Sequence, residues 1–190
     1  MSNFLLATAL FSAALALGTR MASGVSADTV EGLNQLLGLM ESLGPLVLLL
    51  VIFLNNAIKT LGAIVLGIAL GLPPLVFIIV NGFVIGVLAA GLKSVAGYGV
   101  IVASMAPHGL IEVPILLLAT ALGFAVGRES LRWLTGRRSL VRSQLRQAIK
   151  VYLKWILIGL FVAAAIEVFV TPLFINWAGG GELIHGDLAP

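Results

Sequence analysis

Residues 107–127 read PHGLIEVPILLLATALGFAVG, and this stretch is almost entirely apolar from Leu110 onwards. A helix needs about 20 apolar residues to cross roughly 30 Å of hydrocarbon, so the stretch is long enough to span a bilayer. Its beginning nevertheless carries His108 and Glu112, which lie four residues apart and therefore on one face of a helix. The stretch predicts a membrane-embedded helix, and its two ionisable groups require an explanation.

The whole chain shares this apolar character. It has 190 residues, of which 60% are hydrophobic and 10% are charged, and its mean hydropathy is +1.14. A soluble domain carries about 25% charged residues, so this composition is that of an integral membrane protein. No polar stretch is long enough to build a second folded domain, and we expect residues 1–190 to form one membrane domain.

Cysteine is absent from the sequence. Its absence excludes disulfides, thiolate nucleophiles, iron–sulfur clusters and cysteine-ligated zinc. Any metal ion would have to be bound by His108, His185 and carboxylates. No serine and acid are spaced to form a catalytic triad with His108, and no glycine-rich phosphate loop is present, so we expect no enzyme activity. An intramembrane metal-dependent hydrolase is the minor alternative.

Five apolar segments predict an all-α bundle of transmembrane helices, with spans at residues 4–22, 45–71, 74–92, 109–127 and 151–176. The first is short enough for a cleaved signal peptide, but no positive charge precedes it and Arg20 follows it, so we expect a retained helix. The pair Pro73 and Pro74 indicates a turn or a re-entrant break. Residues 91–106 are expected to form a loop, and residues 28–43 an amphipathic helix on the outer surface.

Charge distribution predicts the orientation. Eight of the eleven basic residues lie between Arg128 and Lys154. Positive loops stay in the cytoplasm, so the segment 128–150 is expected to be cytoplasmic, with the N-terminus inside and the C-terminus outside the plasma membrane. Five of these residues recur at every fourth position and would form one stripe on a helix: Arg138, Arg142, Arg146, Lys150 and Lys154.

This basic stripe favours contact with the anionic lipids of the cytoplasmic leaflet. An acidic protein partner is the alternative. Binding of nucleic acid is not expected, because no aromatic or base-reading side chains are interleaved with the basic ones.

Six polar side chains are expected to converge in the outer half of the bundle, as judged from their depth along the spans. They are Asn55, Asn56, Lys59, His108, Glu112 and Glu167, whereas Asn81 is a second polar position on the cytoplasmic half of its span. Three interpretations remain open: structural contacts between helices, a solvated cavity that binds a proton or cation, and a metal site built from His108, Glu112 and Glu167. Two carboxylates and one imidazole are a thin ligand set, so neither a metal nor a cofactor is predicted.

Glu167 lies deep in the last span, where an unpaired charge costs about 2.5–3.5 kcal/mol. Lys59 is placed deep in another span. We therefore expect the two side chains to lie within hydrogen-bonding reach, directly or through one water, with Glu112 as the alternative acceptor.

Glycines spaced four residues apart let helices approach closely, which suits packing within the bundle as well as dimerisation. The pairs are Gly67 with Gly71, Gly82 with Gly86, and Gly123 with Gly127.

Three blocks of the sequence together resemble the stage II sporulation protein M family: LNNAIKTLGAIVLGIALGLPPLVFIIVNGFVIG at residues 54–86, PHGLIEVPILLLATALGFAVG at 107–127 and AAAIEVFVTP at 163–172. The resemblance implies a polytopic, non-enzymatic membrane protein. In spore-forming bacteria it implies a scaffold that helps to assemble peptidoglycan-degrading partners during engulfment. The polar positions of the family correspond here to Asn55, Asn56, Asn81, His108, Glu112 and Glu167.

The expected function is therefore a membrane scaffold or assembly factor with protein partners. The alternative is a small transporter or channel that uses the polar cluster, and that function would favour a homodimer.

Overall fold

A computed structural model describes residues 1–22, 43–138 and 140–179 of the chain. Among these residues, five helices are long and apolar enough to cross a membrane: Ser2–Met21, Pro45–Ile68, Leu72–Gly91, Gly97–Leu134 and Val141–Trp177. The prediction of an all-α bundle with five spans is confirmed. Almost all of the expected amphipathic helix at 28–43 lies outside the described residues, as does His185.

The five spans are built from six α-helices and two short helical turns. The first span is α1 (Ser2–Met21), and the second is α3 (Pro45–Val65) with a 3₁₀ turn at Leu66–Ile68. The long helix α4 (Leu72–Leu134) supplies two spans. The last span joins α5 (Val141–Val151), a π-helical turn (Tyr152–Ile156), α6 (Leu157–Phe169) and α7 (Thr171–Trp177).

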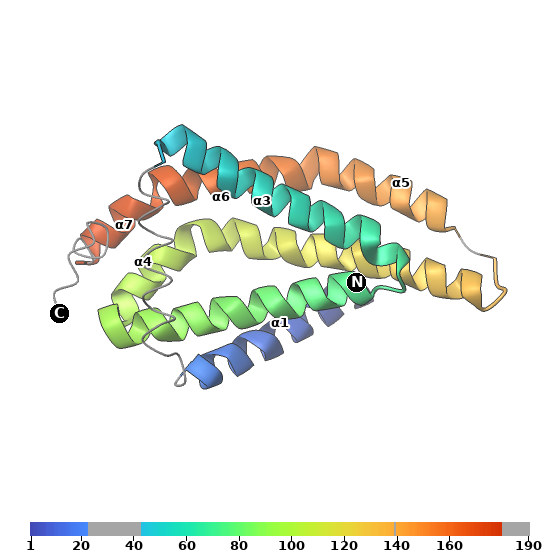
Figure 1. Ribbon diagram of the computed structural model, residues 1–190, viewed down its shortest axis with the longest axis horizontal. Coiled ribbons are helices and arrows are strands. Elements are labelled where there is room, and N and C mark those ends of the chain that lie inside the picture. Colours follow the sequence, from blue (N-terminus) through green and yellow to red (C-terminus); the bar gives the residue numbers. More distant parts are fainter. Residues whose placement is uncertain (23–42, 139, 180–190) are drawn as a thin grey trace.

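Successive spans run in opposite directions along the bundle (Figure 1). The N-terminus, the turn between α3 and α4, and the connection between α4 and α5 lie toward one end, where α4 and α5 extend beyond the other helices. The start of α3, the break in α4 and the end of α7 lie toward the other end. The N-terminus and the basic segment thus lie on one side of the bundle and the end of α7 on the other, as the charge distribution predicted. Which end faces the cytoplasm stays a prediction.

A single glycine divides α4 into two spans. Gly97 has φ 79° and ψ 175°, a left-handed conformation that glycine adopts without a steric penalty, and the chain reverses there. Residues 98–106 are helical, so the prediction of a loop at 91–106 was wrong. The fourth span therefore begins at Gly97 instead of residue 109, and Pro107 and Pro114 lie inside the helix.

The double proline marks the start of a complete span and not a re-entrant break. Pro73 and Pro74 occupy the first turn of α4, where a missing N–H has no helical partner to lose. Gly71, with φ 80°, precedes that turn in the left-handed conformation and redirects the chain from α3.

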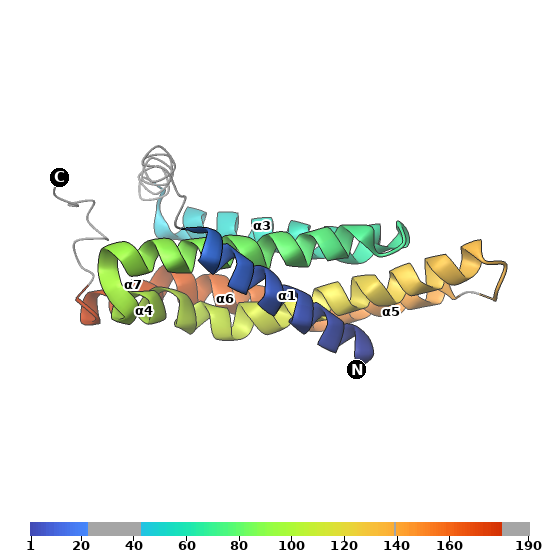
Figure 2. The ribbon, with the colours of Figure 1, turned by 90° about the horizontal axis from the view of Figure 1, so that it is seen from below.

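The glycine pairs lie at contacts within one chain. A Cβ on Gly82 would lie 2.6 Å from the carbonyl oxygen of Phe11 on α1, and one on Gly86 would overlap the backbone of Leu15. Gly67 faces Gly123 in the same way. The glycines thus permit α1 to pack closely on the first half of α4, and α1 crosses that helix obliquely (Figure 2). They also permit the end of α3 to pack closely on the second half of α4.

Two apolar clusters hold the bundle together. The larger joins α3, the second half of α4 and the last span, and the smaller joins α1 to α4. The larger contains Ala57, Ile64, Ala119, Val126, Ala148, Tyr152, Ile156 and Leu160. Because this cluster sets how α3, α4 and α6 face one another, it also positions the polar side chains described next.

Candidate functional site

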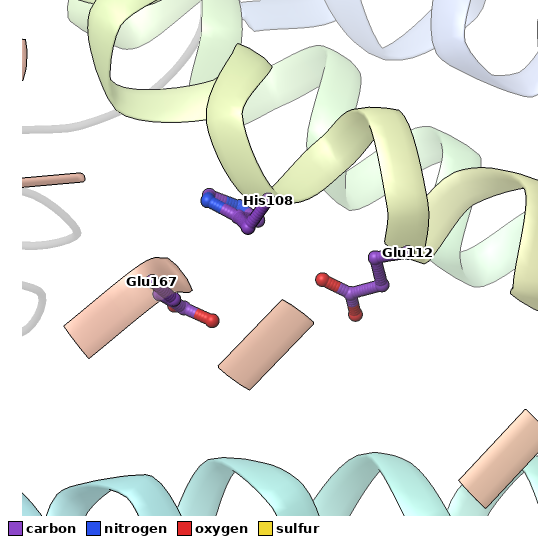
Figure 3. A group of neighbouring side chains, drawn as sticks. All are labelled: His108, Glu112 and Glu167. Atoms are coloured by element: carbon purple, nitrogen blue, oxygen red, sulfur yellow. The ribbon is translucent and has the colours of Figure 1, made fainter. Parts of the chain in front are cut away.

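Two neighbouring helices bring three ionisable side chains to one point. His108 and Glu112 lie one turn apart on the second half of α4, and Glu167 lies on α6. Each offers one ligand atom, and these atoms all lie within 4.8 Å of one another. The carboxyl groups of Glu112 and Glu167 point toward each other below the helix that carries His108 (Figure 3). All three side chains are half-buried.

The site lies near the middle of the bundle. His108 is eleven residues after the start of its span at Gly97, and Glu167 is ten residues before the end of the last span at Trp177. At 1.5 Å per residue, both are about 15–17 Å from the same end of the bundle. His108 therefore does not lie at the mouth of its span, where the sequence placed it, because the helix begins eleven residues earlier.

Asn56 extends the site onto α3. Its side-chain amide donates a hydrogen bond of 2.9 Å to Oε1 of Glu112. Asn55 donates in turn to the side-chain oxygen of Asn56, at 3.3 Å. Five of the six residues of the expected polar cluster are therefore connected by these contacts and by the close approach of His108, Glu112 and Glu167.

Lys59 is the sixth residue and lies apart. The expected direct ion pair between Lys59 and Glu167 is not formed, since within the described residues no carboxylate oxygen lies within 4.0 Å of the Lys59 ammonium. The reason is the rotation of α3, which turns Ala57, Thr60 and Ile64 toward the bundle and leaves Lys59 exposed. Its charge is still close enough to act electrostatically on the carboxyl group of Glu112.

Thr171 is a member of the site that the sequence analysis missed. Its hydroxyl lies 3.5 Å from Nδ1 of His108, and it donates a hydrogen bond to the carbonyl of Ile166 at 3.2 Å. One signal could have identified it: Thr171 follows Glu167 by four residues, the spacing that also separates His108 from Glu112. Because the two helices are antiparallel, the approach of Glu167 to Glu112 also brings Thr171 next to His108, one turn further along each helix.

Asn81 is separate from this site. Its amide donates to the carbonyl of Phe77 at 2.7 Å, within its own helix. A hydrogen bond to the preceding turn satisfies the amide locally, so Asn81 needs no partner on another helix.

The basic stripe is shorter than the sequence predicted. Arg142, Arg146 and Lys150 are exposed and lie on α5, but Arg138 precedes the helix and is not part of it. Lys154 lies in the π-helical turn, with Nζ 5.2 Å from the ring centroid of Trp155. Glu129, which the sequence did not single out, holds the connection between α4 and α5. Its carboxylate accepts hydrogen bonds from the Arg132 side chain at 2.7 Å and from the backbone N–H of Leu140 at 3.0 Å.

The fold and the site together define a class: a five-span helical membrane protein with ionisable side chains gathered inside its bundle. Residues 4–172 match the family model described as Stage II sporulation protein M. The chain therefore belongs to this family, as the sequence blocks indicated. It is also 30% identical over 124 residues to an uncharacterized protein of Methanocaldococcus jannaschii, a match that covers 63% of this chain and 68% of that protein. No solved structure matches the chain significantly.

Proposed function

We propose that the protein is a non-enzymatic scaffold or assembly factor of the plasma membrane, and that it binds a partner membrane protein along the outward face of α3. The observation that carries this proposal is the exposure of Asn55 and Lys59 on that face. The two residues lie one turn apart, near the middle of the span Pro45–Ile68. Membership of the stage II sporulation protein M family supports the proposal, because the resemblance implies such a role.

Contact with lipid is energetically unfavourable for the outward face of α3, because this face carries the charge of Lys59. A lysine charge at the centre of a transmembrane helix costs about 2.5–3.5 kcal/mol, and bending the side chain toward the headgroups recovers only part of that. Lys59 is nine residues before Ile68, so about 13 Å of helix separates it from the nearer end of its span. A partner helix that places a carboxylate or a carbonyl against Lys59 removes this cost.

The partner is better matched by a different protein than by a second copy of the chain. A two-fold symmetric contact through this face sets the same residues opposite each other, so it would bring two Lys59 ammonium groups together. Like charges in a low-dielectric contact repel strongly. A transmembrane helix that carries an acidic or amide side chain has the complementary chemistry.

Site-specific photo-crosslinking tests the proposal. A photoreactive residue is introduced at Asn55 or Lys59, and native membranes are irradiated. The matched control is Leu50, which is 51% exposed on the opposite side of α3. We expect a discrete protein adduct from positions 55 and 59 and lipid adducts from position 50. Lipid adducts from all three positions would refute partner binding on this face, and adducts of twice the chain mass would indicate a homodimer instead.

A substitution adds a second readout. Lys59→Met keeps an unbranched side chain that is one atom shorter and removes its charge, so we expect less of the crosslinked partner to co-purify while the chain itself remains folded. Undiminished co-purification would show that the charge of Lys59 plays no part in recognition.

The approach of His108, Glu112 and Glu167 favours a second candidate, a small transporter or channel for a cation or proton. Ionisable residues inside a bundle commonly mark such pathways. Flux of protons or divalent cations into proteoliposomes tests this candidate. Flux that is present in the wild type and lost in Glu167→Gln would establish it, whereas equal leakage with and without protein would exclude it.

A further inference from the structure

The cluster of His108, Glu112 and Glu167 has the composition of a metal-binding site. It supplies one imidazole nitrogen and two carboxylate oxygens from two helices, and these ligand atoms lie within 4.8 Å of one another. Around a tetrahedral ion with bonds of about 2.0–2.2 Å, ligand atoms are about 3.4 Å apart. The three atoms would therefore have to close by at most about 1.4 Å. Glutamate side chains have three rotatable bonds each and reach that far without movement of the backbone.

Charge favours an ion at this point. Two ionised carboxylates deep in a span repel each other, and each is expensive to keep away from water. Lys59 makes no ion pair with either carboxylate within the described part of the chain. One divalent cation would neutralise both carboxylates and would join α4 to α6.

Neighbouring side chains orient the ligands as they do around known metal sites. Thr171 donates its own hydroxyl proton to the carbonyl of Ile166, so its oxygen is available to accept from Nδ1–H of His108 at 3.5 Å. In the tautomer with Nδ1–H donating to Thr171, Nε2 carries the lone pair that a metal would take. Asn56 holds Oε1 of Glu112 at 2.9 Å and leaves Oε2 for the ion. Thr171 and Asn56 would therefore contact the ligands without binding the metal themselves.

We propose that His108, Glu112 and Glu167 bind one divalent transition-metal ion, with zinc as the first choice, and that water occupies its remaining position. Imidazole selects zinc, iron and related ions over magnesium and calcium, which prefer sets made only of oxygen. Three protein ligands leave a coordination position open. The ion clamps α4 to α6, and Asn56 links α3 to the clamp. This inference stands independently of the scaffold function, because the partner-binding face of α3 lies on Asn55 and Lys59.

Zinc titration of the full-length purified protein tests the site. The protein is purified on an affinity tag free of histidine, stripped with a chelator, and titrated with zinc chloride against a chromogenic competing chelator. We expect one saturable zinc ion per chain, which millimolar magnesium does not displace. Elemental analysis after removal of free metal should give the same ratio.

Variants assign the ligands. Glu112→Gln and Glu167→Gln keep size and remove a charged ligand, and we expect each to weaken zinc binding by more than the roughly 10–100-fold that loss of an outer-shell partner costs. Thr171→Val removes only the hydroxyl that orients His108, and we expect a weakening of about 10-fold. His185→Gln is the matched control, because it removes the other histidine of the chain and should leave binding unchanged.

Two outcomes would overturn the proposal. One is a wild-type protein that takes up no saturable zinc ion. The other is zinc affinity that is the same in Glu112→Gln and Glu167→Gln as in the wild type. If the glutamine variants fail to fold, thermal unfolding of the wild type decides instead: zinc should raise the midpoint by about 5 °C or more at 100 times its dissociation constant. No rise, or an equal rise with magnesium, would contradict a site that selects zinc.

Discussion

Gly82 is the position where the packing of the bundle can be tested most directly. A Cβ at this residue would lie 2.6 Å from the carbonyl oxygen of Phe11 and 3.2 Å from Cβ of Ala14, both on α1. Ordinary contacts begin at about 3.4 Å, so Gly82→Ala forces α1 away from α4 by about 0.8 Å. The obstacle is a backbone atom of a helix, which cannot rotate aside as a flexible side chain would.

Insertion of one methyl group into such a contact costs typically about 1–3 kcal/mol. We expect Gly82→Ala to lower the free energy of unfolding by that amount. Gly62→Ala is the matched control, because a Cβ there meets nothing within 4 Å and alanine favours a helix over glycine by up to about 1 kcal/mol. The control should be neutral or slightly stabilising. The measurement is the midpoint of thermal unfolding in one detergent, together with the oligomeric state from size-exclusion chromatography.

Equal midpoints for Gly82→Ala and Gly62→Ala would refute the close packing of α1 on α4. A change in oligomeric state with unaltered stability would instead assign this glycine pair to a contact between chains. Either result would contradict the assignment of the glycines to contacts within the bundle.

Three further predictions concern other parts of the chain. Tyr152→Phe removes a buried hydrogen bond of 2.8 Å to the carbonyl of Ala57, so it should cost about 0.6–1.7 kcal/mol in thermal unfolding, and a neutral result would contradict the contact. Replacing the exposed Arg142, Arg146 and Lys150 by glutamine should weaken retention of anionic lipid by about 1 kcal/mol per residue, as measured by mass spectrometry of co-purified lipid, with zwitterionic lipid as the control. Because the chain contains no cysteine, single cysteines at Ser2, Arg137 and Gly179 can report the orientation with an impermeant maleimide on intact cells. We expect labelling only at position 179, and labelling at 2 or 137 would reverse the topology.

The sequence identified the helices well and their limits less well. Long apolar runs predict transmembrane helices because the bilayer leaves no other way to satisfy the backbone hydrogen bonds. The loop predicted at 91–106 failed because its three glycines and low hydrophobicity are typical of a connection, whereas the chain turns within the single residue Gly97. Prolines 107 and 114 gave a second misleading signal, since the helix continues through both.

For the candidate site, composition and spacing identified which polar side chains lie in the spans, although the depth of His108 was placed eleven residues too close to the end of its span. This was enough to name His108, Glu112, Glu167 and Asn56 as one group, because a polar residue in a span needs another polar residue at similar depth. The direction in which each side chain points depends on the rotation of each helix about its axis. Spacing within one helix does not specify that rotation, and for this reason the expected direct pair of Lys59 with Glu167 is not formed.

By itself, the sequence determined a five-span helical membrane protein, its family, and which ionisable groups lie within its spans, because these follow from hydrophobicity along the chain. Tertiary structure alone decided that Asn56 turns inward while Lys59 faces outward, that Thr171 reaches His108, and that the glycine pairs pack within one chain. The physical reason is that contacts between helices depend on which faces the apolar clusters press together. A rotation of α3 by one residue's turn, about 100°, would exchange the residues that face the site while leaving every sequence spacing unchanged.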